Sequence, residues 1–263
     1  MAHLTPPRLR QTLGRFSTFY AEHETDLAGL AVADLGDWDM TGLDADSALA
    51  RIQLAAEELP KQSVIAYVGG DNAITRPLVA GTGPLATAGV LTFDAHHDVR
   101  SLEAGPSNGN PIRGLFSDGL PDGRVAQIGI HSFANSLAYR RFCEERQVAI
   151  FTMADVDDWG IEDTVNLALQ GLGDRAEWIY LDFDLDVLDV AFAPGCPGAR
   201  PGGMTPRRLA AAAYMCGRHP KVRAADFVEV DPDRDHSEIT LLNLANVLLA
   251  FAAGVADRPP QSR

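Results

Sequence analysis

The sequence lacks any long uninterrupted hydrophobic run. No segment of the 263 residues approaches the roughly 18 to 20 consecutive apolar residues that a transmembrane helix needs. The N-terminus also lacks the succession of basic, apolar and small residues that is typical of a secretory signal peptide. We therefore expect no membrane span and predict that the protein is cytoplasmic.

Positive charge and cysteine are both scarce. The chain has 22 Lys and Arg against 36 Asp and Glu, a formal net charge of -14. Nucleic acid and anionic membranes would repel such a chain, so neither is an expected partner. Cys143, Cys196 and Cys216 are odd in number and lack the spacing of metal ligands. They indicate reduced thiols rather than a disulfide framework.

The interior also lacks a Ser/Gly-rich or charge-rich linker. The composition, 46% hydrophobic and 22% charged, is ordinary for a compact protein with a sizeable core. We therefore predict one domain over residues 1–263, with a disordered tail at about 258–263.

Apolar segments bounded by turn residues alternate with helical segments along the chain. Strands are expected at 63–68, 89–93, 125–130, 148–152, 178–183 and 222–230, and helices at 46–59, 135–146, 161–172, 205–217 and 237–253. Thr205 and Ser237 are expected to cap the last two helices. Consecutive apolar positions separated by ten or more residues are typical of buried parallel strands with crossover helices. The predicted fold is a three-layer α/β/α sandwich with a mostly parallel sheet.

Two acidic clusters follow predicted strands. They are Asp94-Ala95-His96-His97-Asp98 and Asp182-Phe183-Asp184-Leu185-Asp186. Residues at i and i+2 of an extended chain share a side, so Asp184 and Asp186 can face one cavity. Carboxylates with one or two imidazoles suit a hard divalent cation such as manganese. The clusters therefore predict a two-metal site, and an Asp-rich turn that caps a helix is the alternative.

Two further polar groups follow predicted strands. Gly69-Gly70-Asp71-Asn72 follows the first strand, and Glu229 lies near the end of the last one. Ligands bind at the carboxyl ends of strands in open parallel sheets. Polar side chains from four strand ends are therefore expected to lie together at one edge of the sheet.

These segments resemble the ureohydrolase family, which includes arginase, agmatinase and formimidoylglutamase. The resemblance lies in the segments already quoted, in Asp184 to Asp189, and in Ala193-Pro194-Gly195, Pro201-Gly202-Gly203 and Glu229-Val230-Asp231-Pro232. They occur in the family's order from about residue 63 to the last helix. The resemblance implies the arginase-like form of the sandwich, two manganese ions per subunit, and a homo-oligomer, commonly a trimer or hexamer.

Carried over by position, the resemblance implies a set of metal ligands. Asp94 and Asp184 would bridge the ions, Asp98 would bind the first, and His96 and Asp186 the second. The family usually has His at the position of Asn72 as a further ligand of the first ion. A neutral amide oxygen is a weaker donor than a carboxylate, so we expect a weaker first site.

Other segments point within the family. Arginases and agmatinases have a His-Gly-x-Pro segment where this chain has Asn108-Gly109-Asn110-Pro111. Wider strings such as Phe133-Ala134-Asn135-Ser136 resemble bacterial formimidoylglutamases, which hydrolyse N-formimidoyl-L-glutamate to L-glutamate and formamide. That subgroup often has Arg shortly before this string, where this chain has His131. Two alternatives stay open: an agmatinase or guanidino-acid hydrolase that releases urea, and a metal-binding homologue that has lost catalysis.

In this interpretation the metal ions would supply the nucleophile by lowering the pKa of a water molecule. Asp98 is the candidate to relay a proton to the leaving amine. Glu229 is the candidate to pair with the amidinium group of a small amidine or guanidino substrate. Candidates for the rest of the substrate are Arg100, Arg113, Asn108 and Asn135. The alternative for each Arg is a surface salt bridge, and for Glu229 a buried ion pair.

Overall fold

The computed structural model describes residues 2–259. Six parallel strands form the main sheet in the order β3-β8-β7-β4-β5-β6. Their bounds are β3 (Ile65–Val68), β4 (Ala88–Phe93), β5 (Val125–Ile130), β6 (Ala149–Thr152), β7 (Trp178–Asp184) and β8 (Val222–Val228). Every expected strand is present, with ends within two residues of the prediction. The sheet is the parallel one that the apolar runs indicated.

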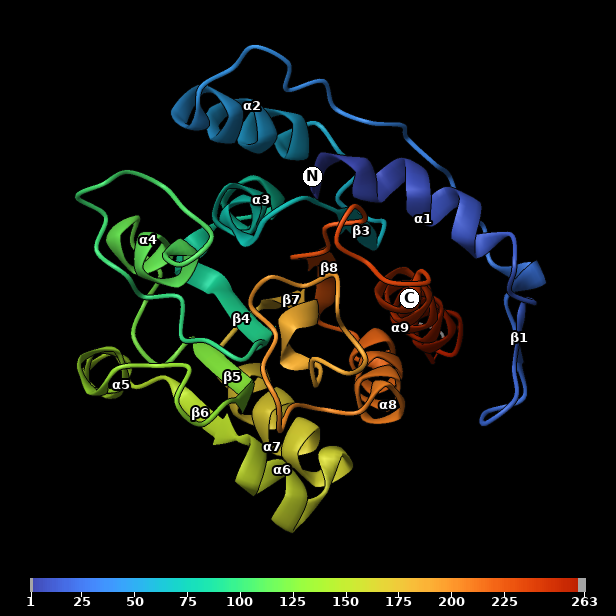
Figure 1. Ribbon diagram of the computed structural model, residues 1–263. Helices are drawn as coiled ribbons and strands as arrows, with labels where there is room; N and C mark the ends of the chain where they lie inside the picture. Colours follow the sequence, from blue (N-terminus) through green and yellow to red (C-terminus); the bar gives the residue numbers. More distant parts are fainter. Residues whose placement is uncertain (1, 260–263) are drawn as a thin grey trace.

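Helices cover both faces of this sheet (Figure 1). One layer contains α2 (Ala45–Glu57), α3 (Thr75–Thr82), α4 (Pro111–Ser117) and α5 (Leu137–Glu145). The other contains α6 (Met153–Trp159), α7 (Ile161–Gly173), α8 (Pro206–Arg218) and α9 (Ile239–Ala256). The three-layer α/β/α architecture is thereby confirmed. The sequence interpretation had missed α3, α4, α6 and α1 (Thr5–Leu13), none longer than nine residues, because so short a segment holds few turns of periodic pattern.

The strands are mostly apolar because each face of the sheet has its own core. Every residue of β7 is buried. Ile179 and Leu181 join the core under α7, α8 and α9, whereas Trp178 and Tyr180 point to the core under α2, α3 and α4. This alternation continues to the end of the strand, so Asp182 lies on the α3 side and Phe183 on the α9 side.

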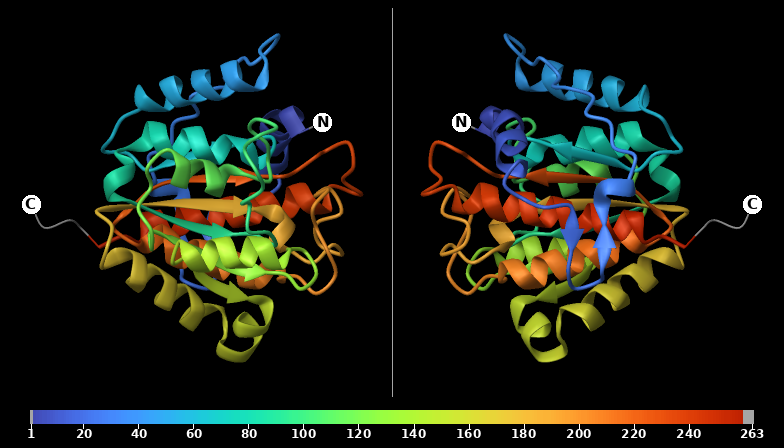
Figure 2. Two further views of the ribbon diagram at one scale, coloured as in Figure 1. Left: turned by 90° about the vertical axis from the view of Figure 1, so that its left-hand side faces the viewer. Right: turned by 90° about the vertical axis from the view of Figure 1, so that its right-hand side faces the viewer.

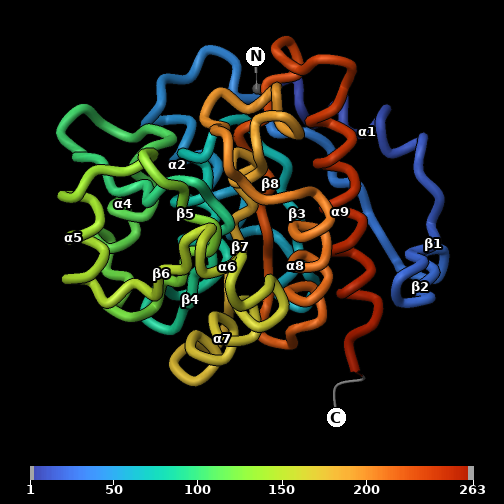
Figure 3. Tube along the Cα trace, turned by 60° about the horizontal axis from the view of Figure 1, so that its bottom comes forward, coloured from blue at the N-terminus to red at the C-terminus, as the bar shows by residue number. Residues whose placement is uncertain are grey.

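The N-terminal segment lies outside the two layers. Helix α1 packs against α9, and the short hairpin of β1 (Phe19–Tyr20) and β2 (Thr25–Asp26) lies beside the same helix (Figure 3). Helix α9 is apolar and long enough, by length and composition alone, to cross a membrane. Half of it is buried in the structure, as in the core helices of soluble proteins.

Local sequence chemistry sets the helix starts. Thr205 caps α8 as expected, because its side chain accepts a hydrogen bond from the Arg208 N–H and Pro206 follows. The prediction that Ser237 caps α9 was wrong. The Asp235 carboxylate takes this role, accepting from the N–H groups of Thr240 and Leu241.

The strands all point toward one end of the molecule, where the loops after β7 and β8 gather (Figure 2). Helix α9 returns the chain to the opposite end. There Arg258 donates hydrogen bonds to the backbone oxygens of Gly217 and Val222. The rest of the predicted tail, residues 260–263, lies outside the described residues.

Three aromatic rings on neighbouring strands hold the centre of the sheet on the α9 side. The Phe183 ring stacks between those of Phe93 and Phe227, with centroid distances of 4.9 and 5.1 Å. We predict that Phe183→Ala lowers the free energy of unfolding by about 3–5 kcal/mol, because a fully buried ring is replaced by a cavity. Urea unfolding measures this. Phe19→Ala, at a ring that is 55% exposed, is the control, and equal small losses in both variants would contradict the prediction.

Candidate metal centre and active site

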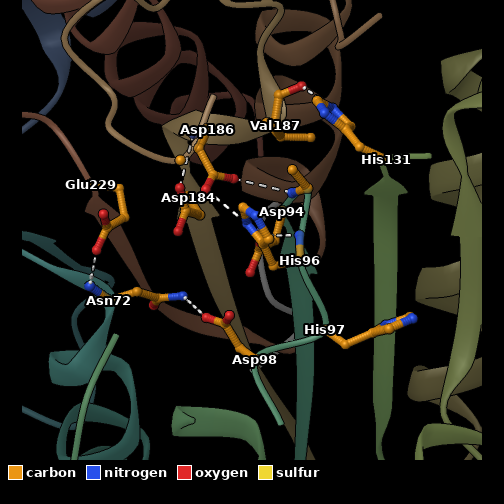
Figure 4. Close-up of polar contacts among 12 residues, drawn as sticks. Asn72, Asp94, His96, His97, Asp98, His131, Asp184, Asp186, Val187 and Glu229 are labelled. Atoms are coloured by element: carbon orange, nitrogen blue, oxygen red, sulfur yellow. Dashed lines mark hydrogen bonds and ion pairs between the residues drawn. The ribbon is translucent and has the colours of Figure 1, made fainter. Parts of the chain in front are cut away.

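The acidic clusters meet at the carboxyl end of the sheet (Figure 4). Asp94 follows β4 and Asp184 ends β7, and these two strands are hydrogen-bonded neighbours. The Asp94, Asp98, Asp184 and Asp186 side chains are all buried, none more than 8% exposed. Segments about ninety positions apart in the chain therefore bring their carboxylates together at one buried site.

One possible ligand group consists of Asp94, His96 and Asp186. The His96 Nδ1 atom lies 2.9 Å from Asp186 Oδ2 and 3.5 Å from Asp94 Oδ1. Backbone groups hold the carboxylates in place: the His96 N–H donates to Asp94 Oδ1, and the Ala95 N–H to Asp186 Oδ1. The turn after β4 thus orients both acidic clusters at once.

A second possible group consists of Asp94, Asp98 and Asp184. Asn72 lies next to it, because its Nδ2 atom donates to Asp98 Oδ2 at 2.7 Å. The Asp184 carboxylate also accepts from the Asp186 N–H at 2.8 Å, which fixes the turn between the two residues. Asp94 belongs to both groups, so two cations bound here would share one carboxylate.

The burial of so many acids changes their protonation. Burial, together with the nearby Asp186, raises the pKa of Asp94 to about 7. Burial and neighbouring acids raise the pKa values of Asp98 and Asp184 well above the ordinary range. Burial also opposes ionisation of Asp186, but the hydrogen bond from His96 outweighs it and lowers that pKa. In return, the acidic partners of His96 overcome its burial and raise its pKa to about 11.

This arrangement fits two divalent cations. The donors are carboxylate oxygens with one imidazole, the set that hard divalent ions prefer. Asp94 Oδ2 is buried and has no hydrogen-bond partner among the described residues. A buried carboxylate oxygen without a donor is costly, and a bound cation would satisfy it.

Glu229 closes the other side of the site. Its Oε1 atom accepts from the Asn72 N–H at 2.8 Å and from Asn108 Nδ2 at 3.3 Å. Burial raises the pKa of Glu229 to about 7. Glu229 and Asp98 both have positive φ, 62° and 52°, which a side-chain-bearing residue adopts only at a cost. The fold thus holds the two predicted catalytic residues in strained backbone positions at the site.

A close approach of backbone is needed beside Asp186. A Cβ atom on Gly198 would lie 2.0 Å from Asp186 Oδ2. Only glycine therefore lets the loop after β7 pack over this carboxylate. Lack of space for a side chain therefore explains why this position of the loop is a glycine.

The predicted substrate-binding residues divide into two pairs. Asn108 reaches the site through its contact with Glu229. Arg100 lies at the surface close by, packed across Gly109, where an added Cβ would lie 2.6 Å from Arg100 Cδ. Asn108 therefore lies next to Glu229, and Arg100 lies beside the residue that follows Asn108 in the chain.

The other pair has structural contacts. The Asn135 amide accepts from the His97 N–H and donates to the Ala95 oxygen, which supports the loop that carries His96. The Arg113 Nε atom donates to the Val99 oxygen, and its guanidinium lies 3.9 Å from the centre of the Phe142 ring. Their predicted role in substrate binding stays a prediction, with structural duties now assigned to both.

Sequence reasoning missed a buried polar group directly below the site. Asp182, the first residue of the second acidic cluster, pairs in register with Asp226 on β8, and both are fully buried. Asp226 Oδ2 accepts from the hydroxyls of Thr75 and Tyr180. Burial and the neighbouring Asp226 raise the pKa of Asp182 well above its usual range, which favours the protonated form of this carboxyl group. The available signal was Asp226 inside strand 222–228, whose other residues, apart from the exposed Arg223, are apolar.

Two further histidines near the site, His97 and His131, and the three cysteines belong to neither ligand group. His97 pairs with Gln127 at 2.7 Å, away from the carboxylates. His131 lies close to Asp186 with one ring nitrogen, Nε2, 3.1 Å from the Val187 oxygen. All three cysteines are buried and free. Burial raises their pKa values, so none is an activated thiol.

Comparison with known proteins identifies the family to which the chain belongs. The sequence model of the Arginase family matches residues 2–254. The chain belongs to the arginase family. Enzymes of this family are binuclear metal hydrolases, and the two ligand groups that share Asp94 provide one set for each ion.

Comparison with individual proteins shows that the chain is similar to formimidoylglutamases. The chain is 39% identical to formimidoylglutamase of Halalkalibacterium halodurans over 96% of its own length and 81% of the relative's. The crystal structure of formimidoylglutamase from Bacillus subtilis superimposes with a TM-score of 0.91 at 33% identity, covering 97% of this chain and 82% of that one. The crystal structure of Trypanosoma cruzi formiminoglutamase with Mn²⁺ has the same fold, with a TM-score of 0.88 at 21% identity, covering 97% and 86%.

Cation binding and protonation compete at this site. The raised Asp94 pKa, about 7, means that the metal-free native chain keeps a proton which the unfolded chain loses near pH 4, so its stability falls as pH rises between the two. His96 acts with the same sign between about pH 6.5 and 11. Cations replace these protons. We predict that manganese raises the melting temperature more at pH 8 than at pH 6.

Thermal unfolding of chelator-treated protein, with and without manganese, measures this difference. Asp184→Asn is the control, because it removes a carboxylate of one ligand group and is expected to reduce the manganese effect at both pH values. A larger stabilisation at pH 6 than at pH 8 in the native chain would contradict the prediction.

Proposed function

We propose that the protein hydrolyses N-formimidoyl-L-glutamate to L-glutamate and formamide, with two manganese ions per subunit. The observation that carries the proposal is the pair of ligand groups sharing Asp94 beneath Glu229, in a chain 39% identical to a formimidoylglutamase over nearly its whole length. Manganese is chosen because the donors suit a hard cation and because the related T. cruzi structure contains it.

In this proposal Asp94 and Asp184 would be ligands of both ions. Asp98 and Asn72 would complete the first site, and His96 and Asp186 the second. When bound, the two ions lower the pKa of a water molecule and so provide the nucleophile at neutral pH. The role left to the protein is to orient the amidine and to move protons.

Glu229 orients the substrate. Its Oε1 atom already accepts from Asn72 and Asn108, so Oε2 is the atom that takes an N–H of the amidinium. An ionised carboxylate in a buried setting forms a strong, directional hydrogen bond with such a cation. The positive φ of Glu229 keeps this carboxylate over the ligand groups instead of following the strand direction.

Asp98 moves the proton. Burial raises its pKa well above the ordinary range, so this carboxyl group takes up a proton more readily than an exposed aspartate does. Asp98 would receive the proton lost by the attacking water and deliver it to the amine of glutamate as the C–N bond breaks.

Two alternatives are less well supported. Hydrolysis of agmatine or a guanidino acid to urea would use the same carboxylates, but the chain has Asn108 where arginases and agmatinases have a histidine. A homologue without catalysis would be consistent with Asn72 in place of a histidine ligand. The intact set of buried carboxylates argues against that loss.

The proposal extends to the setting of the enzyme. We expect a homo-oligomer, a trimer or hexamer, in the cytoplasm. The three buried free cysteines are consistent with a reducing compartment. The negative net charge of -14 supports a small molecule rather than nucleic acid as the partner.

Arg100 is the nearest candidate to bind the carboxylates of glutamate. We predict that Arg100→Met raises KM by about tenfold with little change in kcat, because the lost hydrogen bond to a charged group contributes to substrate binding rather than to the reacting bond. Arg113→Met is the matched control and should lower the melting temperature while leaving KM unchanged. Steady-state kinetics of both variants tests the assignment. The reverse pattern would exchange their roles.

A product assay tests the proposed reaction. Purified, manganese-loaded protein is offered N-formimidoyl-L-glutamate, agmatine, arginine and 4-guanidinobutyrate, and formamide, glutamate and urea are measured. We expect formamide and glutamate from the first substrate alone. Asp184→Asn should lower the rate at least about a hundredfold, whereas Asp163→Ala, on the exposed face of α7, should not. Urea from a guanidino substrate, or no product at all, would refute the proposal.

A further inference from the structure

The Asn72 side chain stands between two different polar neighbours. Its Nδ2 atom donates to Asp98 Oδ2 at 2.7 Å, and its Oδ1 atom lies 2.6 Å from Thr75 Oγ1. Asn72 and Thr75 are both fully buried. No water can therefore replace either contact without opening the site.

The Thr75 hydroxyl cannot satisfy all its neighbours in this arrangement. Its Oγ1 atom also lies 2.7 Å from Asp226 Oδ2. A hydroxyl has one proton, yet here it faces two acceptor oxygens, one on Asn72 and one on Asp226. Tyr180 donates to the same Asp226 oxygen at 2.9 Å, which marks that oxygen as an acceptor. The Thr75 proton therefore belongs to Asp226, and the Asn72 oxygen is left facing another oxygen without a proton between them.

Turning the Asn72 amide by 180° removes this conflict. Nδ2 then donates to Thr75 Oγ1, which donates to Asp226 Oδ2, so each short contact contains one proton. The same turn places Oδ1 against Asp98 Oδ2. Two oxygens at that separation repel each other unless a cation lies beside them, and the Asp94, Asp98 and Asp184 group is where a cation can bind.

We propose that Thr75 and Asp226 are positioning residues that turn the Asn72 amide so that its oxygen faces the cation bound by Asp94, Asp98 and Asp184. The inference rests on the proposed function in that it requires a cation at this group. In this inference the buried Asp226 does more than pack against its neighbours. The hydrogen bonds from Asn72 to Thr75 and from Thr75 to Asp226 fix the orientation of an amide that could otherwise present either its nitrogen or its oxygen to the cation. A carboxylate at position 72 would not need such direction, because its two ends are the same.

Direct metal titration tests the inference without relying on activity. Chelator-treated Thr75→Val, which keeps the shape of the side chain but has no hydroxyl, is titrated with manganese by calorimetry. We expect about a tenfold loss of affinity at the weaker of the two sites, as is usual when an outer partner of a ligand is removed, and little change at the other. Thr75→Ser keeps the hydroxyl and should retain the native affinity.

Two controls separate orientation from general damage. Thr82→Val changes another buried hydroxyl of α3, one that donates to the Leu78 backbone oxygen, and should leave both affinities unchanged. The second control repeats Thr75→Val in an Asn72→Asp background. There the substitution should change manganese affinity less than about twofold, because the two carboxylate oxygens are equivalent.

Each outcome has a separate meaning. If the native chain binds manganese at two sites and Thr75→Val binds it equally well, the inference is refuted and the proposed function is untouched. An equal tenfold loss with Asn72 and with Asp at position 72 also refutes it, since the hydroxyl would then act on the fold. If the native chain binds no manganese, the proposed function is refuted and the inference is refuted with it, because it requires a bound cation. A loss confined to the Asn72 background supports the inference.

Discussion

The site depends on one electrostatic constraint: several carboxyl groups are buried together at the carboxyl edge of a parallel sheet. These buried carboxyl groups cannot all carry an uncompensated negative charge. Protons, His96 or cations must therefore neutralise them. The surrounding backbone is arranged to aim these groups, through N–H donors from the turns after β4 and β7 and through the strained positions of Asp98 and Glu229. Metal binding is therefore the state to which the local structure is adapted.

The chain's main strands and most of its site could be predicted because both depend on local sequence pattern. Strands buried on two faces need continuous apolar runs, and Asp94, Asp184 and Glu229 follow such runs directly. Short helices such as α3 and α4 were missed because eight or fewer residues give little periodicity. Asn135 and Arg113 received substrate roles from their loop positions, whereas their contacts, to the backbone of residues 95–97 and to Val99 and Phe142, depend on tertiary geometry.

The buried polar pair Asp182 and Asp226 connects the site to the interior of the sheet. Both lie on the α3 side of neighbouring central strands, where Trp178 and Tyr180 would lead one to expect apolar residues. Thr75 at the start of α3 connects this pair to Asn72 at the rim. The position of an amide at the metal centre is thus linked to residues that a motif comparison limited to the ligands would overlook.

The pairing of β3 with β8 joins parts of the chain that are synthesised far apart in time. Ile65 pairs with Ala224, and the Glu229 N–H donates to the Gly70 oxygen across the same seam. Asn72 and Glu229, which are 157 positions apart, therefore meet only after most of the polypeptide has left the ribosome. Bringing such distant segments together costs loop-closure entropy before the metal ligands are assembled. Cations are therefore expected to bind late in the maturation of this enzyme.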